Sequence, residues 1–134
     1  MPNVKKYLLG VSTAGAPLAH LSWSAQKTGT PEALELFARI APYLHVFYAT
    51  TFIVLDELVS RRVAPRAGRR QQLAAVGALA GLVFGLVERY VFDVPRVIYG
   101  LADEDQGAAL LPTVALHSAL FAVVVFELER ELLL

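Results

Sequence analysis

Three blocks of about 20 mostly apolar residues set the strongest limit on how this chain folds. They cover residues 41–60, 73–92 and 109–128, and charged segments lie between them. An α-helix rises about 1.5 Å per residue, so about 20 residues cross the roughly 30 Å hydrocarbon core of a bilayer. Hydrophobic residues make up 56% of the chain and the mean hydropathy is +0.52, both above the values of a typical soluble domain. The blocks predict membrane-spanning helices.

A fourth block, residues 7–23, comes first in the chain and is less apolar than the others. Gly10, Gly15 and Pro17 interrupt it, and Lys5 and Lys6 precede it. A cleavable signal peptide is the alternative interpretation, but the polar interior and the lack of a clean cleavage site favour a span. We therefore expect an all-α fold, a single domain forming an integral membrane bundle of four transmembrane helices.

The positive charges predict the orientation of this bundle. Five arginines follow the second span, whereas the connection around residues 102–105 is acidic. Positively charged connections stay on the cytoplasmic side, so four spans place both the N- and C-termini in the cytoplasm. We expect a multi-pass protein of the cell membrane in contact with membrane lipids. The arginines are Arg61, Arg62, Arg66, Arg69 and Arg70.

Composition excludes several classes of function. The formal net charge is zero, so the basic face that binds nucleic acid is not indicated. The chain has no cysteine, which excludes thiolate metal sites, thiol nucleophiles and disulfides.

Ionisable side chains within the predicted spans are the candidate functional residues, because burying charge in a bilayer is costly. Counting along each helix places four of them in the outer half of the membrane: His20, His45, Glu88 and His117. Asp56 and Glu57 lie near the inner end of the second span, about 15 Å deeper by the same count.

Helical periodicity predicts which way these residues face. In the third span, Glu88 shares a side with a glycine ladder that lets a neighbouring helix approach closely, so we expect Glu88 to face the bundle. The other spans each have one polar stripe. The residues that share a side are Gly77, Gly81, Phe84, Gly85 and Glu88 in the third span; His45, Ala49, Phe52 and Asp56 in the second; and Thr113, His117, Phe121 and Val124 in the fourth.

Imidazole and carboxylate groups at one depth suggest a metal centre. His20, His45, Glu88 and His117 are the candidate ligands, since zinc sites use histidine nitrogen and carboxylate oxygen. Haem is the alternative cofactor, held by His45 and His117 or by His20 across facing helices.

Three motifs resemble the PrsW-type intramembrane proteases and, more distantly, the group that includes the CAAX-processing enzymes. They are "DELVSRR" (56–62), "GALAGLVFGLVE" (77–88) and "LHSALF" (116–121). The resemblance implies hydrolysis of peptide bonds in or near the bilayer. It implies a site of Asp56, Glu57, Glu88 and His117, with Glu57 or Glu88 as general base and His117 as metal ligand or oxyanion donor.

The chain departs from this family's pattern in the first motif and in length. Asp56 stands where the family has glutamate, an arginine lies one position from the expected lysine, and there are fewer spans. Two other functions stay open: a redox or metal-binding membrane subunit, and a non-catalytic scaffold or accessory subunit. A membrane-protein substrate, a partner subunit and a homo-oligomer are all compatible with these functions.

Overall fold

The computed structural model describes residues 2–92, 94–98 and 104–133, and helices joined by short turns make up most of these ranges. No strand occurs in these ranges, so the predicted all-α class is confirmed. The elements are α1 (Pro2–Thr28), α2 (Pro31–Leu58), the π-helical turn η1 (Val59–Val63), α3 (Arg69–Tyr90), α4 (Val94–Val97) and α5 (Glu104–Leu133).

The long helices coincide with the predicted spans over most of their length but differ from them at their ends. α2 begins at Pro31, so the segment 31–40, expected as a connection, is helical. α3 ends at Tyr90, two residues before the predicted end of the third span, and the short α4 was not foreseen. Within the described part of the chain, two helical segments are long and apolar enough to cross a membrane, Pro31–Val63 and Arg69–Tyr90.

A tight turn reverses the chain between α1 and α2. Gly29 has φ +72°, a conformation that glycine adopts without a steric penalty. The hydroxyl of Thr30 then caps α2 by accepting a hydrogen bond from the backbone N–H of Ala33 at 3.2 Å, and Pro31 occupies the first turn, where its missing N–H costs nothing. These residues make α1 and α2 an antiparallel hairpin.

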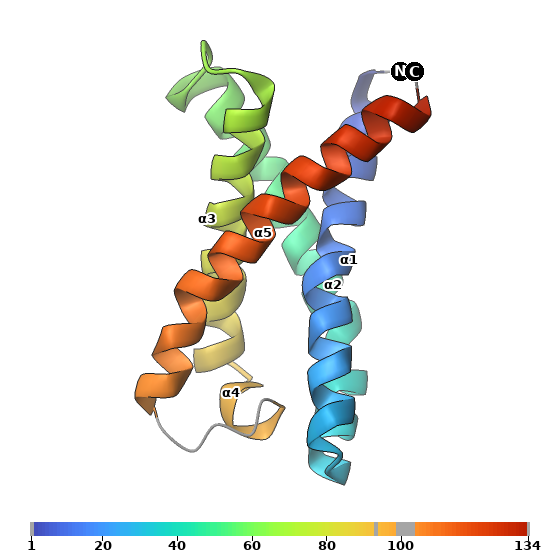
Figure 1. The fold of residues 1–134 in the computed structure, drawn as a ribbon, viewed down its shortest axis with the longest axis vertical. Coiled ribbons are helices and arrows are strands. Elements are labelled where there is room, and N and C mark those ends of the chain that lie inside the picture. Colours follow the sequence, from blue (N-terminus) through green and yellow to red (C-terminus); the bar gives the residue numbers. More distant parts are fainter. Residues whose placement is uncertain (1, 93, 99–103, 134) are drawn as a thin grey trace.

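The helices form a ring in which α5 joins the two halves. α1 packs on α2, α2 on α3, α3 most extensively on α5, and α5 on α1. Figure 1 shows α5 crossing from α3 at one end of the bundle toward α1 at the other. The start of α1, the end of α5 and the connection between α2 and α3 lie at the same end, which we call the arginine end because it holds Arg61–Arg70 (Figure 1).

Two glycines bring α3 and α5 into backbone contact, as the glycine ladder predicts. A Cβ atom on Gly77 would lie 2.6 Å from the carbonyl oxygen of Ser118, and one on Gly81 would lie 2.9 Å from Cα of Ala115. Both distances are shorter than van der Waals contact. The predicted face of α3, including Phe84, Gly85 and Glu88, is buried throughout.

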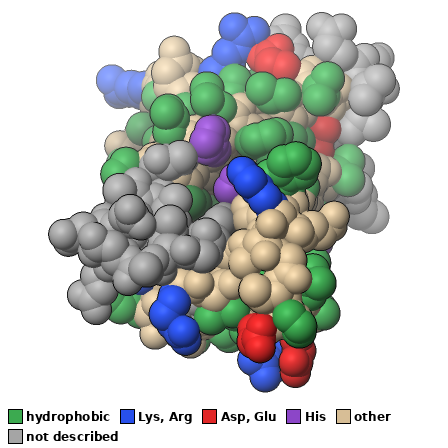
Figure 2. All heavy atoms as spheres, turned by 60° about the horizontal axis from the view of Figure 1, so that its bottom comes forward, with side chains coloured by type: hydrophobic (Ala, Val, Ile, Leu, Met, Phe, Trp, Pro, Cys, Tyr) green, Lys and Arg blue, Asp and Glu red, His purple; other side chains and the backbone are tan. Residues whose placement is uncertain are grey.

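The surface is apolar while several polar side chains are buried. Along α5 the exposed fraction is 61% for Leu116 and 55% for Leu120. Outward apolar rows also run along α2 and α3, whereas Asp56 and Glu88 are only 3% exposed. Figure 2 shows hydrophobic and histidine side chains over the middle of one face, with most visible charged side chains toward its upper and lower edges. Contiguous exposed apolar patches are rarely large in monomeric soluble proteins, and large ones mark contact with a protein, a ligand or a membrane.

The contact between α3 and α5 gives a first prediction. Gly77→Ala should lower the free energy of unfolding by about 1–3 kcal/mol, the usual cost of overpacking, because the new methyl group meets backbone atoms. Gly15→Ala is the matched control, since nothing lies within 4 Å of a Cβ there. It should leave stability unchanged or raise it slightly, as alanine favours helix more than glycine does. Denaturation of the purified proteins in detergent measures the stability of both variants. An equal loss of stability in Gly77→Ala and Gly15→Ala would contradict the close contact at Gly77.

Candidate functional site

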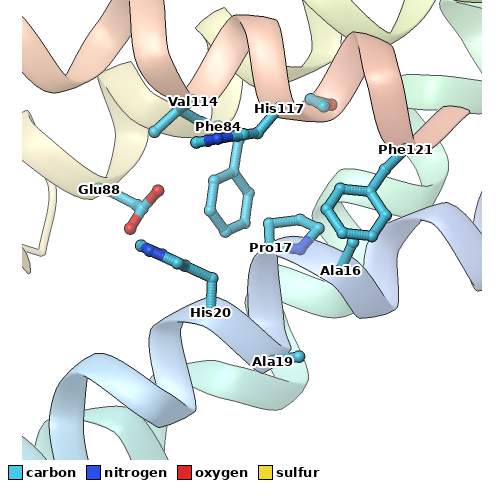
Figure 3. A pocket seen from close by; sticks show the side chains of 10 residues that line it. Ala16, Pro17, Ala19, His20, Phe84, Glu88, Val114, His117 and Phe121 are labelled. Atoms are coloured by element: carbon cyan, nitrogen blue, oxygen red, sulfur yellow. The ribbon is translucent and has the colours of Figure 1, made fainter. Parts of the chain in front are cut away.

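A cavity of about 320 Å³ lies between α1, α3 and α5. It contains three of the ionisable residues that the sequence singles out, His20, Glu88 and His117, one from each helix. Figure 3 shows Glu88 and His20 pointing toward each other at one end of the cavity, with Phe121 at the other. The lining residues are Ala16, Pro17, Ala19, His20, Phe84, Glu88, Val114, His117, Ser118 and Phe121.

Glu88 reaches the cavity because it lies on the glycine side of α3. Its side chain is buried, as predicted, one turn beyond the buried ring of Phe84. Among the described residues, Oε2 of Glu88 is enclosed and has no hydrogen-bond partner. A buried polar atom without a partner is rare in native proteins and needs an explanation, such as a catalytic role or a water molecule or ion bound there.

The two histidines lie at the surface of the cavity. His20 on α1 and His117 on α5 are exposed and close enough to interact electrostatically. His117 and Phe121 line the cavity together, as their shared stripe suggests. The buried side of α5 is a different one, formed by Ser118 and Ala122 against α3.

Ser118, which lines the cavity, is hydrogen-bonded to Tyr48, and neither residue was predicted to belong to the site. The Tyr48 hydroxyl on α2 pairs with the Ser118 hydroxyl on α5. The Tyr48 ring meets the ring of Phe84 edge to face, with centroids 5.7 Å apart. A buried tyrosine normally finds a hydrogen-bond partner for its hydroxyl. The presence of Tyr48 inside an apolar span could therefore have predicted a polar contact in the bundle.

Asp56 does not lie at this cavity but at the arginine end. Arg69 binds it through two hydrogen bonds, Nη1 to Oδ1 at 2.6 Å and Nη2 to Oδ2 at 2.9 Å. Ser60 donates a third at 3.1 Å, and Gln72, beside this pair, donates to the carbonyl of Ala64 at 2.9 Å. Along α3, sixteen residues or about 24 Å separate Gln72 from Glu88.

Glu57 is also remote from the cavity. It forms an ion pair of 2.9 Å with Arg61 one turn further along, and both side chains are substantially exposed. The structure therefore does not bring Asp56 and Glu57 together with Glu88 and His117, and it separates them by more than the depth count from the sequence suggested.

His45 lies on another side of the bundle. Its Nε2 donates a hydrogen bond to the backbone carbonyl of Val11 at 3.3 Å, so it joins α2 to α1 and does not line the cavity. No three His, Asp or Glu side chains in the described ranges are placed to hold one metal ion. The predicted ligand set of His20, His45, Glu88 and His117 is thus not assembled into a zinc site.

Comparisons with known proteins leave the site to be interpreted from its own geometry. No family model, no curated protein and no solved structure matches this chain.

The pairing of Asp56 with Arg69 gives a second prediction. Asp56→Asn should lower the free energy of unfolding by about 1–3 kcal/mol, because it removes a charge-assisted contact and leaves buried polar groups unsatisfied. Glu57→Gln, at the next position, should cost only about 0.3–0.5 kcal/mol, the value of an exposed pair one turn apart.

Denaturation in detergent, with Arg69→Met and the Asp56→Asn/Arg69→Met double variant, completes the test. The double variant should lose less stability than the two single variants lose in sum, since each single change already removes the same interaction. Additive losses, or equal losses at Asp56 and Glu57, would show that the network does not hold α2 to α3.

Proposed function

We propose that the chain is a multi-pass protein of the cell membrane in which α1, α2, α3 and α5 all cross the bilayer. The support is the exposed apolar rows on α2, α3 and α5 combined with buried polar residues. In lipid, apolar side chains face outward at no cost, and polar groups must find partners inside the bundle.

The distribution of charge supports a cytoplasmic arginine end. Eight of the twelve Lys and Arg residues belong to this end, and five of the eight lie in the α2–α3 connection or in the first two residues of α3. α3 spans about 32 Å from Arg69 to Tyr90, close to the thickness of the hydrocarbon core. The eight residues are Lys5, Lys6, Arg61, Arg62, Arg66, Arg69, Arg70 and Arg130.

Aromatic side chains support an outer boundary near the end of α3. Tyr90 is 69% exposed, and the guanidinium group of Arg89 lies 5.0 Å from the centre of its ring. Trp23, in the last part of α1, is exposed as well. Tyrosine and tryptophan gather at membrane–water interfaces, where arginine reaches the headgroups.

Cysteine labelling tests this topology, because the native chain has no cysteine to give a background. Lys27→Cys, near the α1–α2 turn, should react with a membrane-impermeant maleimide in intact cells. Arg66→Cys, in the α2–α3 connection, should react only after the membrane is opened. Equal labelling of both in intact cells would contradict four spans in this orientation.

We further propose that the cavity is a hydrolytic site for a membrane-embedded substrate, in line with the resemblance to PrsW-type intramembrane proteases. The observation that carries this proposal is the buried carboxylate of Glu88, with Oε2 unpartnered among the described residues, beside two imidazoles from separate helices. A carboxylate held in an apolar site without a partner is suited to accept a proton.

In this proposal each of these groups has a chemical role. Glu88 takes a proton from water, and the resulting hydroxide attacks the carbonyl carbon of the bond to be cleaved. A protonated imidazole, His117 or His20, stabilises the oxyanion and passes its proton to the leaving nitrogen as the carbon–nitrogen bond breaks. Products are a carboxylic acid and an amine. Asp56 and Glu57 act outside this site, Asp56 by holding α2 to α3.

The available donors argue against routing this reaction through zinc, because a catalytic zinc needs three protein ligands and the described residues offer no such group. A haem alternative loses His45, which bonds to Val11, and keeps only His20 and His117. Glu88 has a part in hydrolysis but none in haem ligation.

Isotope incorporation tests the hydrolytic proposal. The protein, reconstituted in lipid nanodiscs, is incubated with synthetic single-span peptides in heavy-oxygen water, and mass spectrometry detects label in new carboxyl termini. Glu88→Gln should slow cleavage about 10²–10⁴-fold, the usual contribution of a general base.

The matched control is Glu57→Gln, a carboxylate that the family resemblance also nominates. It should retain full activity, because Glu57 is exposed and remote from the cavity. Loss of cleavage in Glu57→Gln with activity kept in Glu88→Gln would overturn the assignment. Absence of cleavage in every protein would favour the scaffold, and a Soret band would favour haem.

A further inference from the structure

The size of the cavity limits what can enter it. A transmembrane helix with its side chains is about 10 Å across and about 30 Å long, far larger than a cavity of about 320 Å³. The cavity is also near the lower end of the range for small-molecule sites. It therefore admits a single extended chain and not an intact transmembrane helix.

The cavity has a polar end and an apolar end along the bundle axis. On α3, Glu88 is one turn nearer the outer boundary than Phe84, and on the antiparallel α5, His117 is one turn nearer it than Phe121. Figure 3 shows the same separation, with Glu88 and His20 at one end and Phe121 at the other. A single-chain amphiphile in the outer leaflet has this arrangement, with its head near the interface and its chain pointing inward.

The charge at the polar end selects the head group. Oε2 of Glu88 is enclosed and without a hydrogen-bond partner in the described part of the chain. None of the described lining residues is lysine or arginine, and the neighbouring Arg89 lies over the ring of Tyr90. The other ionisable lining residues are His20 and His117, whose imidazoles carry no charge when neutral and then do not repel an amine head. A carboxylate in apolar surroundings gains most from a ligand that supplies both positive charge and N–H donors.

The cavity is open on the side between α1 and α5. Ala19 on α1 and Phe121 on α5 are exposed at its edge, while Phe84 and Ser118 form its buried wall. The neighbouring surface of α5, at Leu116 and Leu120, is apolar. A ligand dissolved in the lipid can therefore enter sideways without passing through water.

We propose that this cavity binds single-chain amphiphiles with a protonated amine head, with the amine against Glu88 and the alkyl chain along Phe84 and Phe121. This proposal rests on the membrane placement of the chain but not on hydrolysis. It adds a ligand class, long-chain alkylamines, that would occupy the site and compete with any substrate for Glu88.

The only tryptophan of the chain reports on this site. Trp23 lies three residues after His20 on α1, so the two side chains are neighbours on one helix face. Bromododecylamine, whose bromine quenches tryptophan fluorescence, is titrated into the full-length protein in nanodiscs. We expect quenching that saturates, above the linear quenching due to partition into lipid.

Matched ligands and variants separate binding from partition. Glu88→Gln should weaken saturable binding about 10- to 100-fold, as expected for loss of a hydrogen bond to a charged group. Uncharged bromododecanol should show no saturable phase with the native protein. His45→Ala, which changes a histidine outside the cavity, should bind the amine as the native protein does.

Each contrary result overturns the proposal in a distinct way. Unchanged saturable binding in Glu88→Gln would show that the carboxylate is not the counter-ion, and equal binding of the alcohol would show an apolar slot without selection for amines. Glu88→Asp keeps the negative charge and provides a second test in case the glutamine variant misfolds. The Glu88→Asp protein should still bind the amine more tightly than the alcohol. These readouts need no cleavage, so failure of the hydrolytic proposal leaves them intact.

Discussion

The close approach of α3 and α5 at Gly77 and Gly81 determines the rest of the architecture. With no side chain at these positions, backbone meets backbone, and α5 is fixed against α3 over its middle turns. α5 then continues toward α1, where it closes the ring of helices. The cavity lies where α1, α3 and α5 face one another beside this crossing. Dispersion forces between close backbones, and not a hydrophobic driving force, stabilise such contacts in lipid.

Much of this fold could be predicted from the sequence because helix period and helix length are local properties. The apolar blocks gave the long helices, and the spacing of Gly77, Gly81 and Glu88 gave the buried face of α3. The extension of α2 to Pro31 was missed, because the prediction followed the apolar block from residue 41, and the charged residues Glu32, Glu35 and Arg39 lie outside that block. Such residues mark the limit of lipid contact, whereas a helix continues into water wherever its caps allow.

The candidate site was predicted only in part, for a physical reason. Periodicity shows which side of a helix carries a residue, but it does not show which neighbour that side meets. His45 was grouped with His117 by depth, yet its side of α2 meets α1 at Val11. Asp56 was grouped with Glu88 by family pattern, yet Arg69, thirteen residues away across a connection, binds it. Contacts of this kind depend on the rotation of whole helices.

The two buried carboxylates in this bundle show how the same group can serve structure or chemistry. Asp56 is fully satisfied by a guanidinium group and a hydroxyl, so its burial fixes α2 against α3 and leaves nothing for a ligand. Glu88 is buried to the same degree but has an oxygen without a partner among the described residues. That cost is removed only by a proton, a water molecule or a cationic ligand. Asp56 is therefore used to hold two helices together, whereas Glu88 is left able to take up one of these three partners.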